Sequence, residues 1–343
     1  MSVADRVTQT ARPILEQAIA ARVFPGGVVE VGCTNGAFVT IAGGRQTYDP
    51  ESTITDEGTI YDLASLTKVL AVAALIADEV TAGRLRLNDR VGEWIAAWTG
   101  EDRQAVTVRD LLEHCSGLPA HRPYYRTRYG RAAIETAICE EPLAYPPRTQ
   151  SVYSDPGFLL LGFALEHAVG ASLNRQFAEW CGRELPADTE LRYLPPRDWL
   201  PRIAPTENTH EGKALRGVVH DENARALDGV AAHAGLFGTA AAVGACARWW
   251  MRSPALRQFS QKSEVPGSSR ALAWDTMLPT SSCGARMSAS AIGHTGFTGT
   301  SLWIDPAADV YVAFLTNRVH PTRDGEGIQD VRRALHDAIF GSL

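Results

Sequence analysis

The chain has 343 residues, of which 45% are hydrophobic, and its 33 lysine and arginine residues against 39 acidic residues leave a net charge of −6. The length and the apolar content predict one large domain or two with a sizeable core. The acidic balance without a basic cluster argues against nucleic-acid binding. The six cysteines lack Cys-x-x-Cys spacing, which predicts isolated thiols in a reducing compartment, with neither a disulfide framework nor a zinc site.

The N-terminal residues and the apolar runs predict a cytoplasmic protein without a membrane partner. Residues 1–6 lack the basic segment and the apolar segment that together form a secretory signal peptide. The longest apolar run, residues 69–77, is too short to span a bilayer. We therefore expect a soluble protein.

The first part of the chain predicts a helix, a β-hairpin and a second helix, in that order. Apolar residues recur at helical spacing over residues 7–19, and the helix is expected to end before Pro25-Gly26-Gly27. Two β-rich runs, residues 28–31 and 38–42, flank a turn at residues 34–36. A helix that is apolar on every side then begins near Ser65 and ends near residue 83.

A serine and a lysine stand at the start of this buried helix. The chain has only three lysines, and Lys68 follows Ser65 by three positions, so both side chains would share one helix face and one proton. The helix N-terminus and burial would lower the lysine pKa from about 10.4 to about 7 and leave an amine that activates the serine. The alternative is a surface lysine after a serine N-cap.

The rest of the chain predicts helices first and strands afterwards. Helices are expected from the cap at Thr107, over residues 157–169, and from the cap at Thr239 to residue 251. Strands are expected at residues 291–296, 300–304 and 310–316, before a final amphipathic helix. The predicted fold is therefore α/β plus all-α. Residues 1–60 and 221–343 would form the α/β domain, residues 61–220 a mainly helical domain, with the active site between them.

Two further segments carry groups that could serve such a serine. Tyr153 lies in a loop before an apolar helix and could hold or relay a proton. The alternative is a half-buried tyrosine before an Asp-Pro turn. The sequence His294-Thr295-Gly296 lies in a strand, where glycine indicates close approach of a ligand or a backbone and the strand edge could offer an N–H to an oxyanion. The alternative is a glycine-rich hairpin with a bulge.

The order of these three segments resembles that of the serine β-lactamase and penicillin-binding-protein superfamily, closest to its class C-like branch. The stretches at residues 111–119 and 233–240 also resemble stretches of that branch. The likeness covers residues 28–316, most of the chain. It implies a β-lactamase/transpeptidase-like fold, an antiparallel sheet flanked by the terminal helices with an inserted helical domain.

The resemblance also implies a role for each residue of the site. Ser65 would be the acyl-forming nucleophile, and Lys68 and Tyr153 would share general-base and general-acid duty. The backbone N–H groups of Ser65 and Phe297 would form the oxyanion hole. The implied substrate-binding residues are Asp155, His294, Thr295, Gly296, Phe297 and Arg318.

Two residues depart from the family pattern. Asp155 stands where asparagine is usual, so it has no amide N–H to donate to a substrate. It could instead hold Lys68 as an ammonium, raise its pKa and leave Tyr153 a larger share of the base role. His294 replaces the lysine that is common in true β-lactamases, which would weaken recognition of a substrate carboxylate at high pH.

Other polar residues are assigned from their position only. Arg318 follows the last strand and either meets an anionic substrate group or forms a structural ion pair. The stretch Val219–Asn223 and His233 either rim the cleft or form a solvated loop. No metal-ligand spacing and no phosphate-binding loop are present, so we expect neither a metal nor a cofactor.

These observations predict a serine hydrolase that acts through an acyl-enzyme on a small ester or amide, as an esterase or a D-amino-acid-type peptidase. The alternatives are a β-lactamase or DD-carboxypeptidase, a β-lactam sensor, and a non-catalytic binding or scaffold protein of the same fold. The expected partner is a small-molecule ester, amide or β-lactam, and the oligomeric state is open.

Overall fold

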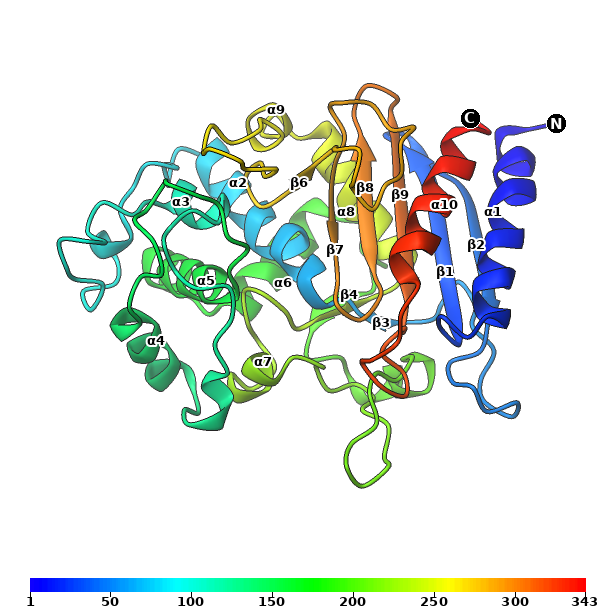
Figure 1. The fold of residues 1–343 in the computed structure, drawn as a ribbon, viewed down its shortest axis with the longest axis horizontal. Helices are drawn as coiled ribbons and strands as arrows, with labels where there is room; N and C mark the ends of the chain where they lie inside the picture. Colours follow the sequence, from blue (N-terminus) through cyan, green and yellow to red (C-terminus); the bar gives the residue numbers. More distant parts are fainter.

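The computed structural model describes residues 1–343 and builds them around a six-stranded antiparallel sheet (Figure 1). The strand order is β2-β1-β9-β8-β7-β6. The strands are β1 (Gly26–Cys33), β2 (Gly36–Gly44), β6 (Asp275–Thr276), β7 (Ile292–Thr295), β8 (Ser301–Asp305) and β9 (Val310–Thr316). The predicted hairpin and the three predicted C-terminal strands are confirmed, and N-terminal and C-terminal strands meet where β1 pairs with β9.

Three helices cover the two faces of this sheet. The terminal helices α1 (Val3–Ala20) and α10 (Ile328–Phe340) lie together on one face, and α8 (Ala240–Arg252) lies behind the other (Figure 1). Because both faces are covered, every residue of the central strand β9 is buried. The predicted sheet with flanking terminal helices is confirmed.

Most of the remaining helices form the other half of the molecule. A 3₁₀ turn (Ala64–Leu66) and a π-helix (Lys68–Val72) lead into α2 (Ala73–Thr81). The other helices are α3 (Val108–Leu112), α4 (Arg131–Glu140), α5 (Asp155–Val169), α6 (Leu173–Glu184), α7 (Glu222–Ala226) and α9 (Leu256–Phe259). The predicted caps are present, since the side chains of Thr107 and Thr239 accept backbone N–H groups at the starts of α3 and α8.

A small sheet joins the two halves. It has the order β3 (Tyr61–Asp62), β5 (Leu236–Gly238) and β4 (Leu191–Tyr193), so both predicted domain segments contribute to it. The predicted boundaries at 60/61 and 220/221 stay a prediction.

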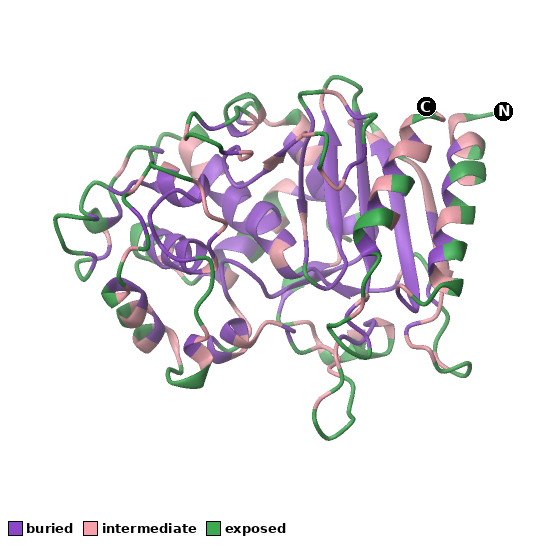
Figure 2. Cartoon of the chain, in the orientation of Figure 1, coloured by how far each residue is buried: buried purple, intermediate pink, exposed green.

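The core runs through both halves, and exposed residues gather on the outer loops (Figure 2). Residues Val69–Ala77 are all buried at the centre of the larger apolar cluster. No single helix is long and apolar enough to cross a membrane, and only α5 with α6, bent by 74°, passes that test as a pair. The fold therefore places Ser65 where the sheet, the small sheet and a fully buried helix meet.

Candidate active site

Ser65 lies in a strained turn between β3 and the buried helix. The preceding residue, Ala64, has φ +46°, a left-handed conformation that residues other than glycine rarely adopt. Its N–H donates to Asp62 Oδ1 at 2.9 Å, which holds the turn. Two threonines of the β7–β8 loop secure it from outside: Thr298 donates to the Asp62 carbonyl at 2.8 Å and Thr300 to the Leu63 carbonyl at 3.1 Å. Ser65 is thus presented on a turn that neighbouring segments fix.

The helix after Ser65 differs from the predicted regular helix. It starts as a 3₁₀ turn, passes through the π-helix Lys68–Val72, and becomes α-helical only at Ala73. A π-helical turn is frequent at functional sites. The altered winding still leaves Lys68 within reach of Ser65, as the predicted spacing required.

Lys68 lies at the centre of the site. Its side chain is fully buried, and its Nζ lies 3.0 Å from Ser65 Oγ, 2.7 Å from Tyr153 Oη and 2.8 Å from Asp155 Oδ1. A fourth contact, at 3.3 Å, reaches the backbone carbonyl of His233. The structure therefore brings together the four polar side chains that the sequence singled out, although Tyr153 and Asp155 follow Lys68 by 85 and 87 residues.

The charge of Lys68 corrects one prediction. Burial acts to lower the lysine pKa, as expected, but the negative charge of Asp155 and the hydroxyl of Tyr153 outweigh it, so the pKa is raised. The pKa near 7 expected from the helix N-terminus and burial is therefore wrong. The other possibility, that Asp155 holds Lys68 as an ammonium, matches this geometry.

Tyr153 is held by the start of α5. Ser154 caps that helix by accepting the Gly157 N–H at 3.0 Å, and the Ser154 N–H donates to Nδ1 of His114 at 3.0 Å. The His114 ring lies 4.7 Å from the Tyr153 ring, centroid to centroid. Burial raises the pKa of Tyr153 more than Lys68 lowers it, so the pKa of the phenol is raised. At neutral pH the resting site holds an ammonium and a neutral phenol.

Asp155 completes this cluster as its anion. Burial disfavours the carboxylate, but Lys68 outweighs burial and holds the pKa of Asp155 far below its usual range. The other carboxylate oxygen faces His121, whose Nδ1 lies 3.9 Å away. This contact raises the pKa of His121. Asp155 is thus ionised whenever the protein is folded near neutral pH.

The end of β7 forms the opposite wall of a cleft of about 590 Å³, which Ser65, Tyr153 and Asp155 also line. His294, Thr295, Gly296 and Phe297 line this wall, as predicted for the substrate edge. A Cβ on Gly296 would lie 2.7 Å from the Leu63 carbonyl, so only glycine allows this strand to approach the Ser65 turn. The predicted close approach of another backbone is confirmed.

His294 is a neutral wall residue. It is 2% exposed, and burial, with Lys68 and Arg270 nearby, lowers its pKa well below the usual range. Its Nδ1 contacts the Thr295 carbonyl at 2.9 Å, and its Nε2 has no hydrogen-bond partner. His294 is therefore already uncharged at neutral pH. It cannot cause the expected weakening of carboxylate recognition at high pH, because it has no charge left to lose.

Arg318 lies at the rim beside Phe297. It donates to the backbone carbonyls of Phe297, Arg323 and Gly325 at 2.9, 3.0 and 3.1 Å, and it contacts no carboxylate. Its guanidinium also lies 4.6 Å from the centroid of the Phe297 ring. The alternative of a structural ion pair is therefore wrong, and the cation is free to meet an anion in the cleft.

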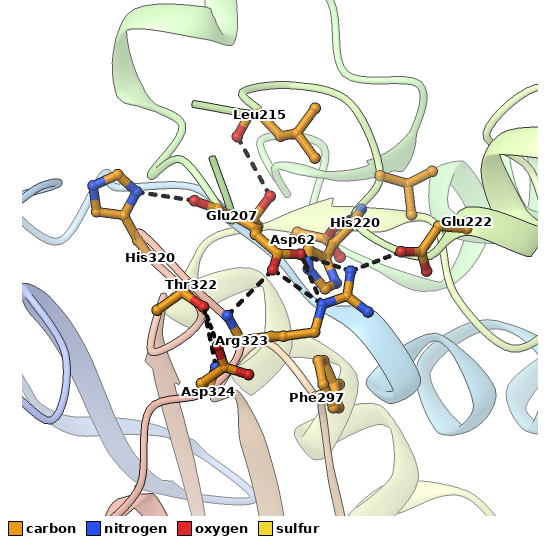
Figure 3. A network of polar contacts seen from close by, with 12 residues as sticks. Asp62, Glu207, Leu215, His220, Glu222, Phe297, His320, Thr322, Arg323 and Asp324 are labelled. Carbon is orange, nitrogen blue, oxygen red and sulfur yellow. Dashed lines mark hydrogen bonds and ion pairs between the residues drawn. The ribbon is translucent and has the colours of Figure 1, made fainter. Parts of the chain in front are cut away.

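A polar network supports the same rim (Figure 3). Asp62 Oδ2 accepts the His220 N–H at 2.6 Å, and His220 Nε2 contacts Glu207 at 3.0 Å. Arg323 pairs with Glu207 at 2.6 Å and with Glu222 at 2.7 Å. Because Asp62 also holds the Ser65 turn, this network connects the turn to the rim. The stretch around residue 220 therefore rims the cleft and is not simply a solvated loop.

Several residues of the cleft were not identified from the sequence. They include His121, Tyr125, Arg270, Asp275, Arg323 and Arg332. Arg332 is only 2% exposed and donates to the carbonyls of Gly296 and Thr300 at 3.2 and 2.7 Å, which fixes the end of β7 from α10. None of them belongs to a spaced motif, so the sequence holds no local signal for them. No group of three or more His, Cys, Asp or Glu side chains is placed to hold a metal.

Comparison with known proteins fits this geometry. The family model described as Beta-lactamase matches residues 11–336. The chain belongs to the beta-lactamase family. Its membership confirms the predicted superfamily and the serine hydrolase class.

Relatives within the beta-lactamase family carry several names. The chain is 29% identical over 307 residues to a putative D-alanyl-D-alanine carboxypeptidase of Escherichia coli, covering 77% of this chain and 70% of that protein. It is 30% identical over 309 residues to an N-acetylmuramyl-L-alanine amidase of Bacillus subtilis, covering 78% and 70%.

Solved structures of beta-lactamase fold align over nearly the whole chain. A class C beta-lactamase superposes with a TM-score of 0.81 at 18% identity, covering 99% of this chain and 97% of that one. EstCE1, a hydrolase with promiscuous acyltransferase activity, superposes with a TM-score of 0.78 at 18% identity, covering 98% and 99%. At these identities the likeness shows the fold, and the predicted fold class is confirmed.

Proposed function

We propose that the protein hydrolyses a small ester or amide through an acyl-enzyme on Ser65. The observation that carries this proposal is the position of Lys68 Nζ, within hydrogen-bond distance of both Ser65 Oγ and Tyr153 Oη, the hydroxyls of two residues that line one cleft. A serine beside groups that can take up and return its proton can act as a nucleophile. A scaffold protein would have no need to bury a lysine against these two hydroxyls.

The proton route follows from the charges. Lys68 stays an ammonium against Asp155, so Tyr153 is the group that loses its proton to solvent and then, as phenolate, takes the one from Ser65. As that proton moves, the bond from Ser65 Oγ to the substrate carbonyl carbon forms. The leaving group departs with the proton from Tyr153. A water then cleaves the acyl-enzyme by the same route and releases the acid.

The developing oxyanion has two donors available. The N–H groups of Ser65 and Phe297 donate to no other atom of the protein. Both stand at the cleft, one in the strained turn and one in the wall that continues from the end of β7. Preorganised N–H groups of this kind stabilise a tetrahedral intermediate without rearranging during the reaction.

Asp155 beside Lys68 and Arg318 at the rim indicate which chemical groups the substrate carries. Asp155 accepts hydrogen bonds only, which favours an acyl group that donates an N–H over the amide-accepting side chain of common β-lactams. Arg318 lacks an ionic partner, which favours a carboxylate elsewhere on the substrate. A small D-amino-acid peptide or ester offers both groups. The name of the E. coli relative supports this class, and the name of the B. subtilis relative supports cleavage of an amide. A DD-carboxypeptidase is the second candidate because Arg318 would suit a terminal carboxylate.

The first experiment tests the nucleophile. We expect a fluorophosphonate to add one phosphonyl group per chain, located at Ser65 by peptide mass spectrometry, with release of fluoride. We also expect steady hydrolysis of p-nitrophenyl esters by the same preparation. Ser65→Ala, which removes only the hydroxyl, is the negative control for both. An adduct of equal yield on Ser65→Ala, or no adduct on the wild type after prolonged exposure, would leave the scaffold alternative standing.

A second prediction concerns Arg318. We expect Arg318→Gln to lower kcat/KM for a carboxylate-bearing D-alanyl ester by roughly 10-fold relative to its neutral methylated analogue, because one hydrogen bond between charged groups is lost. Most of this change should appear in KM. The neutral analogue controls for any disturbance of Phe297. An unchanged ratio between the two substrates would remove Arg318 from anion recognition.

A further inference from the structure

Tyr153 has a second cation next to it, in addition to Lys68. Arg270 stands in the segment that leads into the edge strand β6, and its guanidinium carbon lies 4.9 Å from the centroid of the Tyr153 ring. Arg270 and Tyr153 both line the cleft. A guanidinium this close to a phenol ring acts on it electrostatically, and more strongly in a site that is shielded from water.

The charge of Arg270 is only partly compensated. Asp275 Oδ1 lies 2.5 Å from Nη1, yet this buried nitrogen has no aligned hydrogen bond. The carboxylate is itself a weak partner, because burial raises the pKa of Asp275 more than Arg270 lowers it. The guanidinium side chain is 19% exposed. Its field therefore remains available to neighbouring groups.

The other charged and titratable groups around Tyr153 are either paired or neutral. Lys68 is paired with Asp155 at 2.8 Å, so these two charges largely offset each other. The remaining neighbours of the ring are His114 at 4.7 Å and His294 at 5.8 Å. Both are neutral, since burial, Arg270 and Lys68 together lower the pKa of each well below its usual range.

We propose that Arg270 is a positioning residue that acts through Tyr153: its charge stabilises the phenolate that takes the proton of Ser65. This proposal rests on the proposed function, because it concerns the same proton transfer. It also accounts for the departure at His294. The wall of the cleft has a neutral histidine at this position, and Arg270 supplies a positive charge beside it. Arg270 reaches this wall because its ion-pair partner Asp275, on β6, pairs with Gly293 on β7.

The proposal predicts a shift in pH dependence and not merely a slower enzyme. A cation near a phenol favours its ionised form, and an opposite charge at this distance typically shifts a pKa by about one unit or more. We expect Arg270→Gln to react with the fluorophosphonate about 10-fold more slowly than wild type at pH 7.5, with the difference closing as the pH rises toward 11. Arg270→Lys, which keeps the charge, should restore most of the rate at pH 7.5.

A second variant tests the sign. Asp275→Asn removes the anion that partly offsets Arg270, so its rate–pH curve should move to lower pH, opposite to that of Arg270→Gln. The matched control is Arg126→Gln, because the guanidinium of Arg126 lies 5.8 Å from the ring of Tyr125, a tyrosine without contact to Lys68. Its rate–pH curve should stay where the wild-type curve lies.

The outcomes separate this inference from the proposed function. Arg270→Gln and Arg270→Lys curves that are lower at every pH by the same factor would assign Arg270 a packing role and overturn the inference. A curve for Asp275→Asn that moves to higher pH would overturn it too, even where Arg270→Gln fails to fold. Absence of a Ser65 adduct on the wild type at every pH would instead overturn the proposed function, and this inference with it.

Discussion

Lys68→Met is expected to abolish turnover and to destabilise the protein. We expect kcat/KM for p-nitrophenyl esters to fall by about 10³-fold or more, because the group that orders Ser65 and Tyr153 and balances the charge of the proton transfer is lost. Methionine fills a similar volume, so the loss would not arise from a cavity. Ester hydrolysis and fluorophosphonate labelling measure this directly.

The stability effect has a different cause. Removing Lys68 leaves Asp155 largely buried without its cation, and such an uncompensated charge costs roughly 3 kcal/mol. The cost must depend on pH. In the wild type the pKa of Asp155 lies far below its usual range, so the ion pair is intact throughout pH 5–8. In Lys68→Met burial alone would raise that pKa, so the deficit is largest at pH 8 and shrinks as the pH falls and the carboxyl takes up a proton.

The double variant separates the two effects. Lys68→Met combined with Asp155→Asn has neither charge of this buried pair. Its Tm should therefore recover most of the loss, and its difference in Tm from wild type should no longer depend on pH. Turnover should stay absent. Arg175→Met is the control for simple loss of an ion pair, because Arg175 and Glu179 are 72% and 59% exposed and such pairs add little stability. Turnover by Lys68→Met within 10-fold of wild type would contradict the role given to Lys68.

The sequence predicted the four polar groups of the site in two ways: Ser65 and Lys68 from their helical spacing, and the roles of Tyr153 and Asp155 with the help of the family resemblance. Three spaced motifs in order placed Ser65, Lys68, Tyr153 and Asp155, and the structure joins them through one nitrogen. Helical and strand periodicity likewise predicted the hairpin, the C-terminal strands and the terminal helices. The fold class needed the resemblance as well, since periodicity alone does not say which strands pair.

The protonation states depend on distances between segments far apart in the chain, so the local sequence left two alternatives for Lys68 open. A lysine at a buried helix start is expected to lose its proton, and the 2.8 Å contact with Asp155, together with the Tyr153 hydroxyl, reverses that direction. Arg270 and Arg332 were missed for the same reason. Each reaches the cleft from an element whose local sequence is ordinary, so only the packing of β6 and α10 against β7 reveals them.

Tyr153→Phe is expected to lower the rate of Ser65 acylation by about 10²–10⁴-fold while leaving the fold intact. The change removes one oxygen, and Lys68 keeps its contacts with Ser65, Asp155 and the His233 carbonyl. The Tm should therefore stay close to that of wild type. Tyr125→Phe is the matched control, because Tyr125 lines the same cleft but its hydroxyl contacts Arg126 and not Lys68.

The pH dependence should show which group serves as the base. In the wild type the pKa values of both Lys68 and Tyr153 are raised, so both hold their protons at neutral pH and the acylation rate should climb as the pH rises. In Tyr153→Phe the only remaining base is Lys68, which must lose its proton against the attraction of Asp155. Its small residual rate should therefore also climb as the pH rises. A Tyr153→Phe enzyme with the wild-type rate and pH curve would mean that the amine of Lys68 takes the serine proton by itself, and the phenol would then serve only to hold it in place.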